Sequence, residues 1–179
     1  PGSVAYAPTA LLLPGLERLL QVRRVLGLRN SAHSLVKLLD PLAHQGLRSI
    51  VVGSYTHPEY AQSMAATFAL TGACALLLRG TDGEPVADPR RTPQMDAFLH
   101  GQPPRVPDAQ GGPLAALPSL PTAIDAAHTS AWIRSVLDGA QPVPAPIAQQ
   151  VEHILRLAAQ MTTEPAHAVH RPPAPPAPH

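Results

Sequence analysis

The chain has 179 residues, enough to bury a core, and 45% of them are hydrophobic against 14% charged, which excludes a fully disordered protein. Aromatic residues make up only 3%, so an extended stacking platform for single-stranded nucleic acid is excluded. Lys and Arg number 13 against 12 Asp and Glu, and the net charge of +1 favours no class of partner. The 23 prolines and 12 glycines follow no period, which excludes collagen.

The sequence of residues 4–47 predicts a short apolar segment followed by two helices. The first helix is expected over residues 14–27, where leucines recur on one arc and polar side chains on the other. Arg23 falls in the middle of the apolar arc. Because a guanidinium is almost never buried unpaired, Arg23 is expected to meet a carboxylate, extend to the edge of the arc or face a polar site.

The second helix is expected from Ser31 to Asp40, with Asn30 or Ser31 as its N-cap and Pro41 as its stop. His33 and Lys37 stand four residues apart on its polar face, so their side chains are neighbours. With three arginines they form a basic cluster within fifteen residues, and no acid occurs between positions 18 and 39: Arg23, Arg24, Arg29, His33 and Lys37. Such a cluster is typical of a phosphate-binding surface, and the alternative is an ordinary solvated helix face.

Residues 48–80 predict a strand, a helix and a second strand, the order of a parallel unit, so the fold class is α/β with helices flanking a mostly parallel sheet. Thr56 and Glu59 have capping-box spacing at the helix start, and Gly72 suits its end. Ligands bind beyond the carboxyl ends of parallel strands. The candidate ligand residues in the two loops there are Ser54, His57, Thr81, Asp82 and Glu84. The alternative is that both loops are simple connections.

The rest of the chain carries weaker signals. Residues 81–122 predict short strands and loops and hold a second basic pair, Arg90 and Arg91. Two helices are expected in residues 123–162, and residues 164–179 are Pro, Ala and His rich, which predicts a disordered tail after a domain over 1–163. Cys74 lies in an apolar run and is interpreted as a buried, inert thiol. No Cys/His metal spacing occurs, and no apolar run is long enough for a membrane span.

Several strings resemble a known enzyme family. V-R-R-V-L-G-L-R at 22–29 and L-L-D-P-L at 38–42 resemble the second half of anthranilate phosphoribosyltransferases, of glycosyl transferase family 3. R-N-S-A-H-S-L-V-K at 29–37 and S-Y-T-H-P-E-Y at 54–60 are closer to the YbiB-type nucleic-acid-binding relatives of these enzymes. The resemblance implies the later part of the family's large α/β domain. The N-terminal helical domain, which implies a homodimer for the intact protein, and the phosphate loop have no counterpart here.

One departure from the enzymes bears on activity. They hold Mg²⁺ through adjacent Asp and Glu in G-x-D-G-x-D-E, whereas residues 80–86 read G-T-D-G-E-P-V and lack that pair. Arg23 matches the arginine that contacts the anthranilate carboxylate in the enzymes. The leading hypothesis is therefore a cytoplasmic, non-enzymatic protein without a cofactor that binds the DNA or RNA backbone irrespective of sequence. The alternatives are an Mg²⁺-dependent phosphoribosyltransferase and a chain without independent activity.

Overall fold

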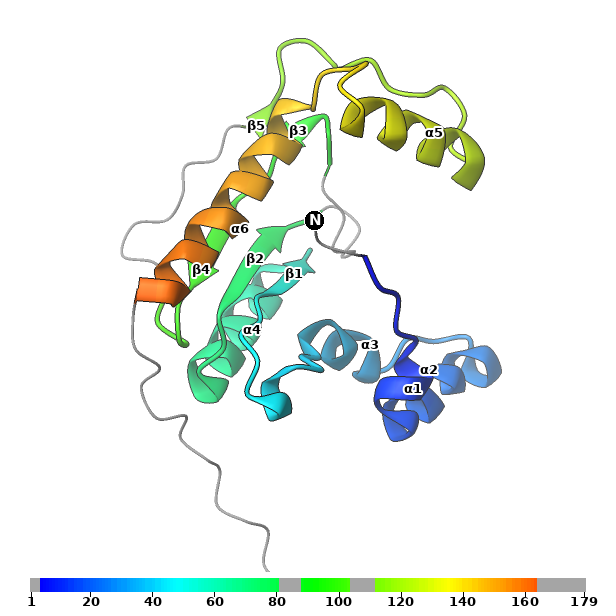
Figure 1. Cartoon of the computed structure of the whole chain (residues 1–179). Helices are drawn as coiled ribbons and strands as arrows, with labels where there is room; N and C mark the ends of the chain where they lie inside the picture. The colour runs from blue at the N-terminus through cyan, green and yellow to red at the C-terminus, as the bar shows by residue number, and fades with distance from the viewer. Residues whose placement is uncertain (1–3, 81–87, 104–111, 164–179) are drawn as a thin grey trace, which may run out of the picture.

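A computed structural model of the chain describes residues 4–80, 88–103 and 112–163. At its centre is a three-stranded sheet of β1 (Val51–Tyr55), β2 (Ala75–Arg79) and β4 (Met95–Phe98), in the order β1-β2-β4 (Figure 1). The α/β class is confirmed. The sheet is mixed, however, because β1 pairs with β2 in parallel and β4 pairs with β2 antiparallel. The expectation of a mostly parallel sheet is wrong, because a parallel third strand needs a crossover, usually helical, and the connecting segment is rich in Pro and Gly.

Each face of the sheet is covered by one helix. On one face, α4 (Pro58–Thr71) packs Met64 and Phe68 against the strands, with the Phe68 and Phe98 ring centroids 5.3 Å apart. On the other face, α6 (Ala145–Thr163) contributes Ile154 to a cluster with Leu76, Leu78 and Met95. Figure 1 shows the two helices on either side of the sheet. The core therefore lies in the middle of the chain and at its last described helix.

The predicted strand, helix and strand of residues 48–80 are confirmed as β1, α4 and β2. The helix ends as expected at Gly72, whose φ of 67° lies in the left-handed region. The predicted capping box is wrong. Pro58 is the first helical residue and His57 the N-cap, while the Thr56 hydroxyl lies 2.9 Å from His57 Nδ1. Cys74 is buried, as predicted, and accepts a hydrogen bond from the His100 backbone N–H at 3.4 Å.

The N-terminal helices form an arm beside this sheet. The predicted apolar segment is the short α1 (Thr9–Leu12), and the first predicted helix is α2 (Pro14–Leu26), which ends at a left-handed Gly27. The second predicted helix is shorter than expected. One α-helical turn, α3 (Ala32–Leu35), tightens into the 3₁₀ turn η1 (Val36–Leu38), and a second 3₁₀ turn, η2 (Ala43–Gln45), leads toward β1. Leu39, which follows η1, already has extended backbone with φ of −64° and ψ of 127°, so the helical segment ends before it reaches the predicted stop at Pro41.

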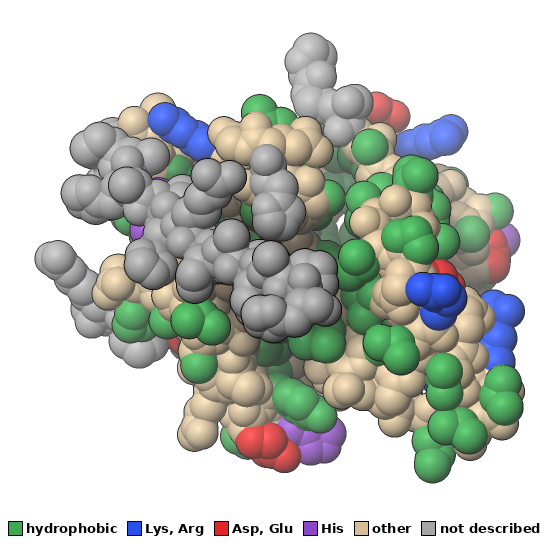
Figure 2. Space-filling view, turned by 90° about the horizontal axis from the view of Figure 1, so that it is seen from below, with side chains coloured by type: hydrophobic (Ala, Val, Ile, Leu, Met, Phe, Trp, Pro, Cys, Tyr) green, Lys and Arg blue, Asp and Glu red, His purple; other side chains and the backbone are tan. Residues whose placement is uncertain are grey.

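The apolar arc of α2 is only partly buried. Only Leu16 of this helix is buried, whereas Leu19 is 54% and Leu26 64% exposed. Hydrophobic side chains gather on this side of the molecule, over α1 and α2 (Figure 2). Arg23 is exposed as well, so its place in the arc does not bury its charge. The helices α1 and α3 contact α2 but leave Leu19 and Leu26 open to solvent.

The later segments follow the predicted order. β3 (Arg91–Thr92) pairs with β5 (Gly112–Pro113), and α5 (Ala126–Leu137) precedes α6. The side chain of Asp125 caps α5 by accepting the backbone N–H groups of Ala127 and His128, both at 3.0 Å. Within the described ranges, no helix has the length and apolarity that crossing a bilayer requires. The predicted tail and the candidates Thr81, Asp82 and Glu84 lie outside the described residues.

Candidate functional site

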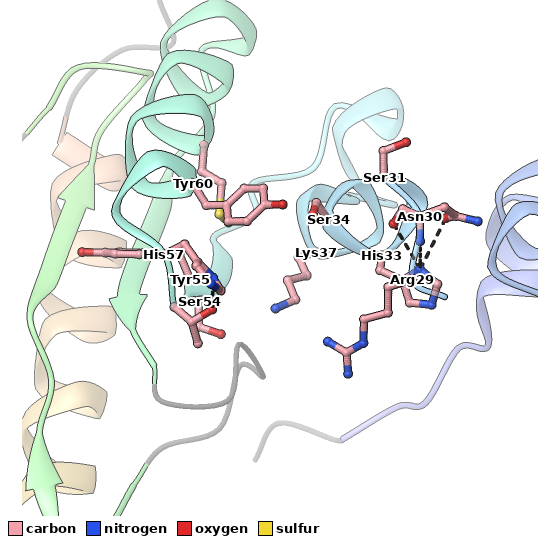
Figure 3. A pocket seen from close by; sticks show the side chains of 12 residues that line it. Arg29, Asn30, Ser31, His33, Ser34, Lys37, Ser54, Tyr55, His57 and Tyr60 are labelled. Atoms are coloured by element: carbon pink, nitrogen blue, oxygen red, sulfur yellow. Dashed lines mark hydrogen bonds between the residues drawn. The ribbon is translucent and has the colours of Figure 1, made fainter. Parts of the chain in front are cut away.

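A pocket of about 430 Å³ lies where the N-terminal arm meets the end of β1 and the start of α4 (Figure 3). One wall, the arm wall, comes from the segment after α2, from α3 and from η1; the other, the strand wall, comes from β1, the loop after it and α4. The lining residues are Arg29, Asn30, Ser31, His33, Ser34, Lys37, Ser54, Tyr55, Thr56, His57, Tyr60 and Met64. The pocket thus brings together the predicted basic segment and the predicted loop beyond a parallel strand, which are far apart in sequence.

The arm wall carries the charge. Arg29 is exposed and Lys37 half-buried, and Figure 3 shows both side chains pointing into the space between the walls. In the described part of the chain neither forms an ion pair. Among the described residues, no Asp or Glu lines the pocket. Two cations without a carboxylate partner in the described residues therefore face one concavity, an arrangement that attracts an anion.

Asn30 fixes the junction that positions Arg29. Its Nδ2 donates to the Leu19 carbonyl on α2 at 2.7 Å, and its Oδ1 accepts the Ala32 backbone N–H at 3.0 Å. Of the two predicted caps, Asn30 therefore makes the capping bond, while Ser31 makes none with its side chain. His33 turns Nδ1 toward the Asn30 carbonyl at 3.2 Å. The sequence folds this way because an Asn side chain can replace the backbone partners that a helix start lacks.

The strand wall is buried and polar in one place. Ser54 is 2% exposed, and its Oγ has no hydrogen-bond partner in the described residues. An unsatisfied buried hydroxyl is unusual and costs stability, so it is a feature that demands an explanation. The neighbouring Tyr55 is 6% exposed; burial raises the pKa of its phenol, the Asp96 carboxylate raises it further, and Arg79 opposes them.

The remaining predicted cations lie outside the pocket. Arg23 and Arg24 are exposed on the last turn of α2. Arg90 is bound by Asp88, with Nε 2.9 Å from Oδ1 and Nη2 3.2 Å from Oδ2, and this hydrogen bonding lowers the pKa of Asp88. Arg91 lies in β3. Arg90 and Arg91 therefore do not join the two cations of the pocket, and their predicted phosphate role stays a prediction.

Sequence reasoning missed one chemically important lining residue, Tyr60. Its side chain is in the first turn of α4, 44% exposed, with its ring centroid 6.0 Å from that of His57 in an edge-to-face contact. The sequence could have indicated Tyr60, because it is the last residue of the string S-Y-T-H-P-E-Y, which starts at Ser54. The structure thus adds an aromatic face to the predicted cations.

The described residues hold no preformed metal site, because no group of three or more His, Cys, Asp or Glu side chains comes together among them. Asp82 and Glu84, which stand where the phosphoribosyltransferases carry their Mg²⁺ acids, lie outside the described residues.

No family model matches the chain. Over 144 residues, or 78% of its length, it is 38% identical to a protein of Escherichia coli (strain K12) described as uncharacterized protein YbiB. The chain is homologous to YbiB. This confirms the resemblance to YbiB-type proteins, and the matched share is large enough to include β1, α4 and β2 wherever it starts. The match covers 42% of the length of YbiB, so the chain spans less than half of that protein.

Proposed function

We propose that this chain binds nucleic acid, irrespective of sequence, by contacting backbone phosphates. The observation that carries the proposal is the pairing of Arg29 and Lys37 in one pocket that no carboxylate of the described residues lines. Arg23 and Arg24 extend the same basic segment along α2, where both are exposed. Contacts to phosphate give affinity and position without reading base sequence, which suits exposed Arg and Lys side chains with no base-reading partners.

The low net charge of the chain does not oppose this function. Salt screens an exposed charge over about 8 Å at physiological ionic strength, so a phosphate senses the local cluster rather than the sum over the molecule. The acids of the described residues that form ion pairs, Asp88, Asp125 and Glu152, pair with residues outside this cluster. The basic segment therefore acts as a local positive surface.

A phosphoribosyltransferase is the second candidate, because the pocket lies beyond the carboxyl end of a parallel strand, where ligands bind in α/β folds. The donor set argues against it. Residues 80–86 hold one Asp and one Glu separated by Gly83, not the adjacent pair of the enzymes, and we derive no step through Mg²⁺. A thermal-shift assay with Mg²⁺ and phosphoribosyl pyrophosphate separates the candidates, because only a binder of both is stabilised by them together.

The proposal is tested by fluorescence anisotropy with a labelled single-stranded oligonucleotide over a range of salt concentrations. The triple variant Arg24→Ala, Arg29→Ala, Lys37→Ala is expected to bind weakly to all sequences. Each lost phosphate contact should lower the salt slope by about 0.7 for a single strand. The single variant Arg23→Ala should also weaken binding, and it should leave the melting temperature unchanged, because Arg23 is exposed.

The matched control is Arg134→Ala, which removes an exposed arginine from α5, outside the pocket. It should leave both affinity and salt slope unchanged. A triple variant that binds with the parent's affinity and slope would show that the basic segment contacts no phosphate, and the proposal would fail.

A further inference from the structure

The pocket is concave, and contacts to a nucleic-acid backbone do not require a concavity. Phosphodiester contacts need only exposed cations, such as Arg23 and Arg24 supply on α2. A concavity of about 430 Å³ instead has the size of pockets that take up small molecules. The residues that line it therefore indicate a smaller and more specific ligand than a strand lying across the surface.

The charge of the pocket matches a terminal phosphate better than an internal one. A phosphomonoester carries about −1.5 to −2 charges at pH 7, whereas each backbone phosphodiester carries one. Arg29 and Lys37 provide two positive charges from one wall, and no carboxylate lines the pocket in the part of the chain that the structure describes. Arg29 can form two parallel hydrogen bonds to phosphate oxygens, and Lys37 adds a point charge with three donors.

Tyr60 gives the pocket a surface for a base. Its ring lines the pocket and is 44% exposed, and Figure 3 shows it extending from α4 toward the arm wall. Stacking on an aromatic ring holds any base, because every base has a π face. The chain has few aromatic residues, and Tyr60 accompanies only one cation pair, so the arrangement suits one base rather than a run of them.

Ser54 places an unsatisfied hydroxyl group in the strand wall. Its buried Oγ has no partner in the described residues, and a hydroxyl both donates and accepts. A ligand oxygen reaching this wall would satisfy it, whereas an empty wall leaves the cost in place.

We propose that the pocket binds one nucleoside monophosphate unit, with its phosphate on Arg29 and Lys37 and its base against Tyr60. The unit is either a free nucleotide or the 5′-phosphorylated end of a strand, which share this chemistry. This inference rests on the proposed function for the strand-end source only. It goes further by separating a pocket for a single terminal nucleotide from the exposed surface for backbone phosphates.

The experiment compares two 3′-labelled decathymidylates in anisotropy with the full chain, one with a 5′-phosphate and one with a 5′-hydroxyl. The 5′-phosphate should tighten binding about tenfold, since it adds charge-assisted hydrogen bonds. Thymidine monophosphate should displace the 5′-phosphorylated strand, and thymidine should not. If the free nucleotide binds but the 5′-phosphate does not tighten strand binding, the pocket takes free nucleotides and the strand-end source is excluded.

Variants assign the two halves of the ligand. Lys37→Ala and Arg29→Ala should each abolish the tighter binding that the 5′-phosphate gives. Tyr60→Leu should weaken the binding of thymidine monophosphate at least fivefold, while Tyr60→Phe should retain it. Arg134→Ala should change none of these values. Inorganic phosphate that competes as well as the nucleotide, together with an inert Tyr60→Leu, would overturn the role of the base.

The outcomes also separate this inference from the proposed function. If the 5′-hydroxyl strand binds through Arg23 and Arg24 but neither the 5′-phosphate nor the nucleotide adds anything, the pocket inference is overturned and nucleic-acid binding stands. If the nucleotide binds and neither strand does, nucleic-acid binding fails and the pocket inference stands for the free nucleotide.

Discussion

The two walls of the pocket belong to regions that are held together in different ways. Behind the strand wall lie residues such as Leu76 and Leu77, which are 0% and 1% exposed. In the arm, Val25 is 85% and Leu26 64% exposed, and Asn30 provides hydrogen bonds that join α2 to α3. The sheet region therefore supplies a fixed shape through buried apolar area, while the arm supplies the charged side chains. A binding site for a flexible anion gains from both.

The largest expected difference concerns apolar truncation. Leu76→Ala should lower the free energy of unfolding by about 2–5 kcal/mol, because it leaves a cavity in the core. Leu26→Ala should change it by less than about 0.5 kcal/mol, because the side chain is largely exposed. Urea denaturation followed by circular dichroism measures both values. A cost above about 1 kcal/mol for Leu26→Ala would show that the apolar face of the arm is covered in solution.

Two glycines with the same backbone conformation sharpen the comparison. Gly101 and Gly27 have φ of 77° and 70°, but a Cβ at Gly101 would lie 2.7 Å from the Phe68 carbonyl oxygen, while one at Gly27 meets nothing within 4 Å. Gly27→Ala should cost about 1–2 kcal/mol, the conformational penalty alone. Gly101→Ala should cost clearly more, because the backbone of α4 must also shift. Equal changes in urea midpoint for the two variants would contradict a tightly packed sheet region beside an open arm.

The polar anchor of the arm gives a smaller effect. Asn30→Ala removes the bonds to Leu19 and Ala32 and should cost about 1 kcal/mol. It should also weaken phosphate binding, because Arg29 is the neighbour of Asn30 at this junction. Asn30→Asp keeps the acceptor for Ala32 but loses the donor to Leu19, so its stability should fall between those of the parent and Asn30→Ala. Thermal melts and anisotropy on the same samples measure both effects; a stable Asn30→Ala with unchanged affinity would remove Asn30 from the site's support.

The smallest expected effect is a dependence on alkaline pH that belongs to the strand wall. The pKa of Tyr55 is raised in the folded chain, first by burial and then by Asp96, with Arg79 opposing. The neutral phenol therefore contributes stability that is complete below the ordinary tyrosine pKa near 10 and is lost as pH rises through the raised value. Between pH 8 and 11 the parent should lose more melting temperature than Tyr55→Phe. Identical losses would place the alkaline sensitivity elsewhere.

The sequence predicts the local units of this fold better than their assembly. Residues 48–80 carry two apolar runs around a helix that ends at Gly72, and these local signals are sufficient for β1, α4 and β2. The antiparallel entry of β4 depends on pairing across a Pro/Gly-rich connection, which leaves no periodic signal. The exposure of Leu19 and Leu26 on α2 could not be predicted either, because periodicity shows that a helix face is apolar but not whether another element covers it.

The candidate site was predicted in pieces. Basic spacing identified Arg29 and Lys37, and the rule for carboxyl ends of parallel strands identified Ser54 and His57. That these pieces line one pocket follows only from the path of η2 and β1, which brings the arm back beside the strand. Tyr60 was missed because a single aromatic in a helix is more often core than contact surface.

The close approach of η1 to β1 leaves little room for a side chain at Gly53. A Cβ there would lie 3.2 Å from Met64 Cε and 3.7 Å from the Lys37 carbonyl oxygen. Alanine would fit after a small movement of the methionine methyl group, whereas a branched side chain would push the Lys37 backbone away from the strand. A small residue at this position therefore lets η1, which carries Lys37, lie close to β1, so the spacing of the two pocket walls depends on it.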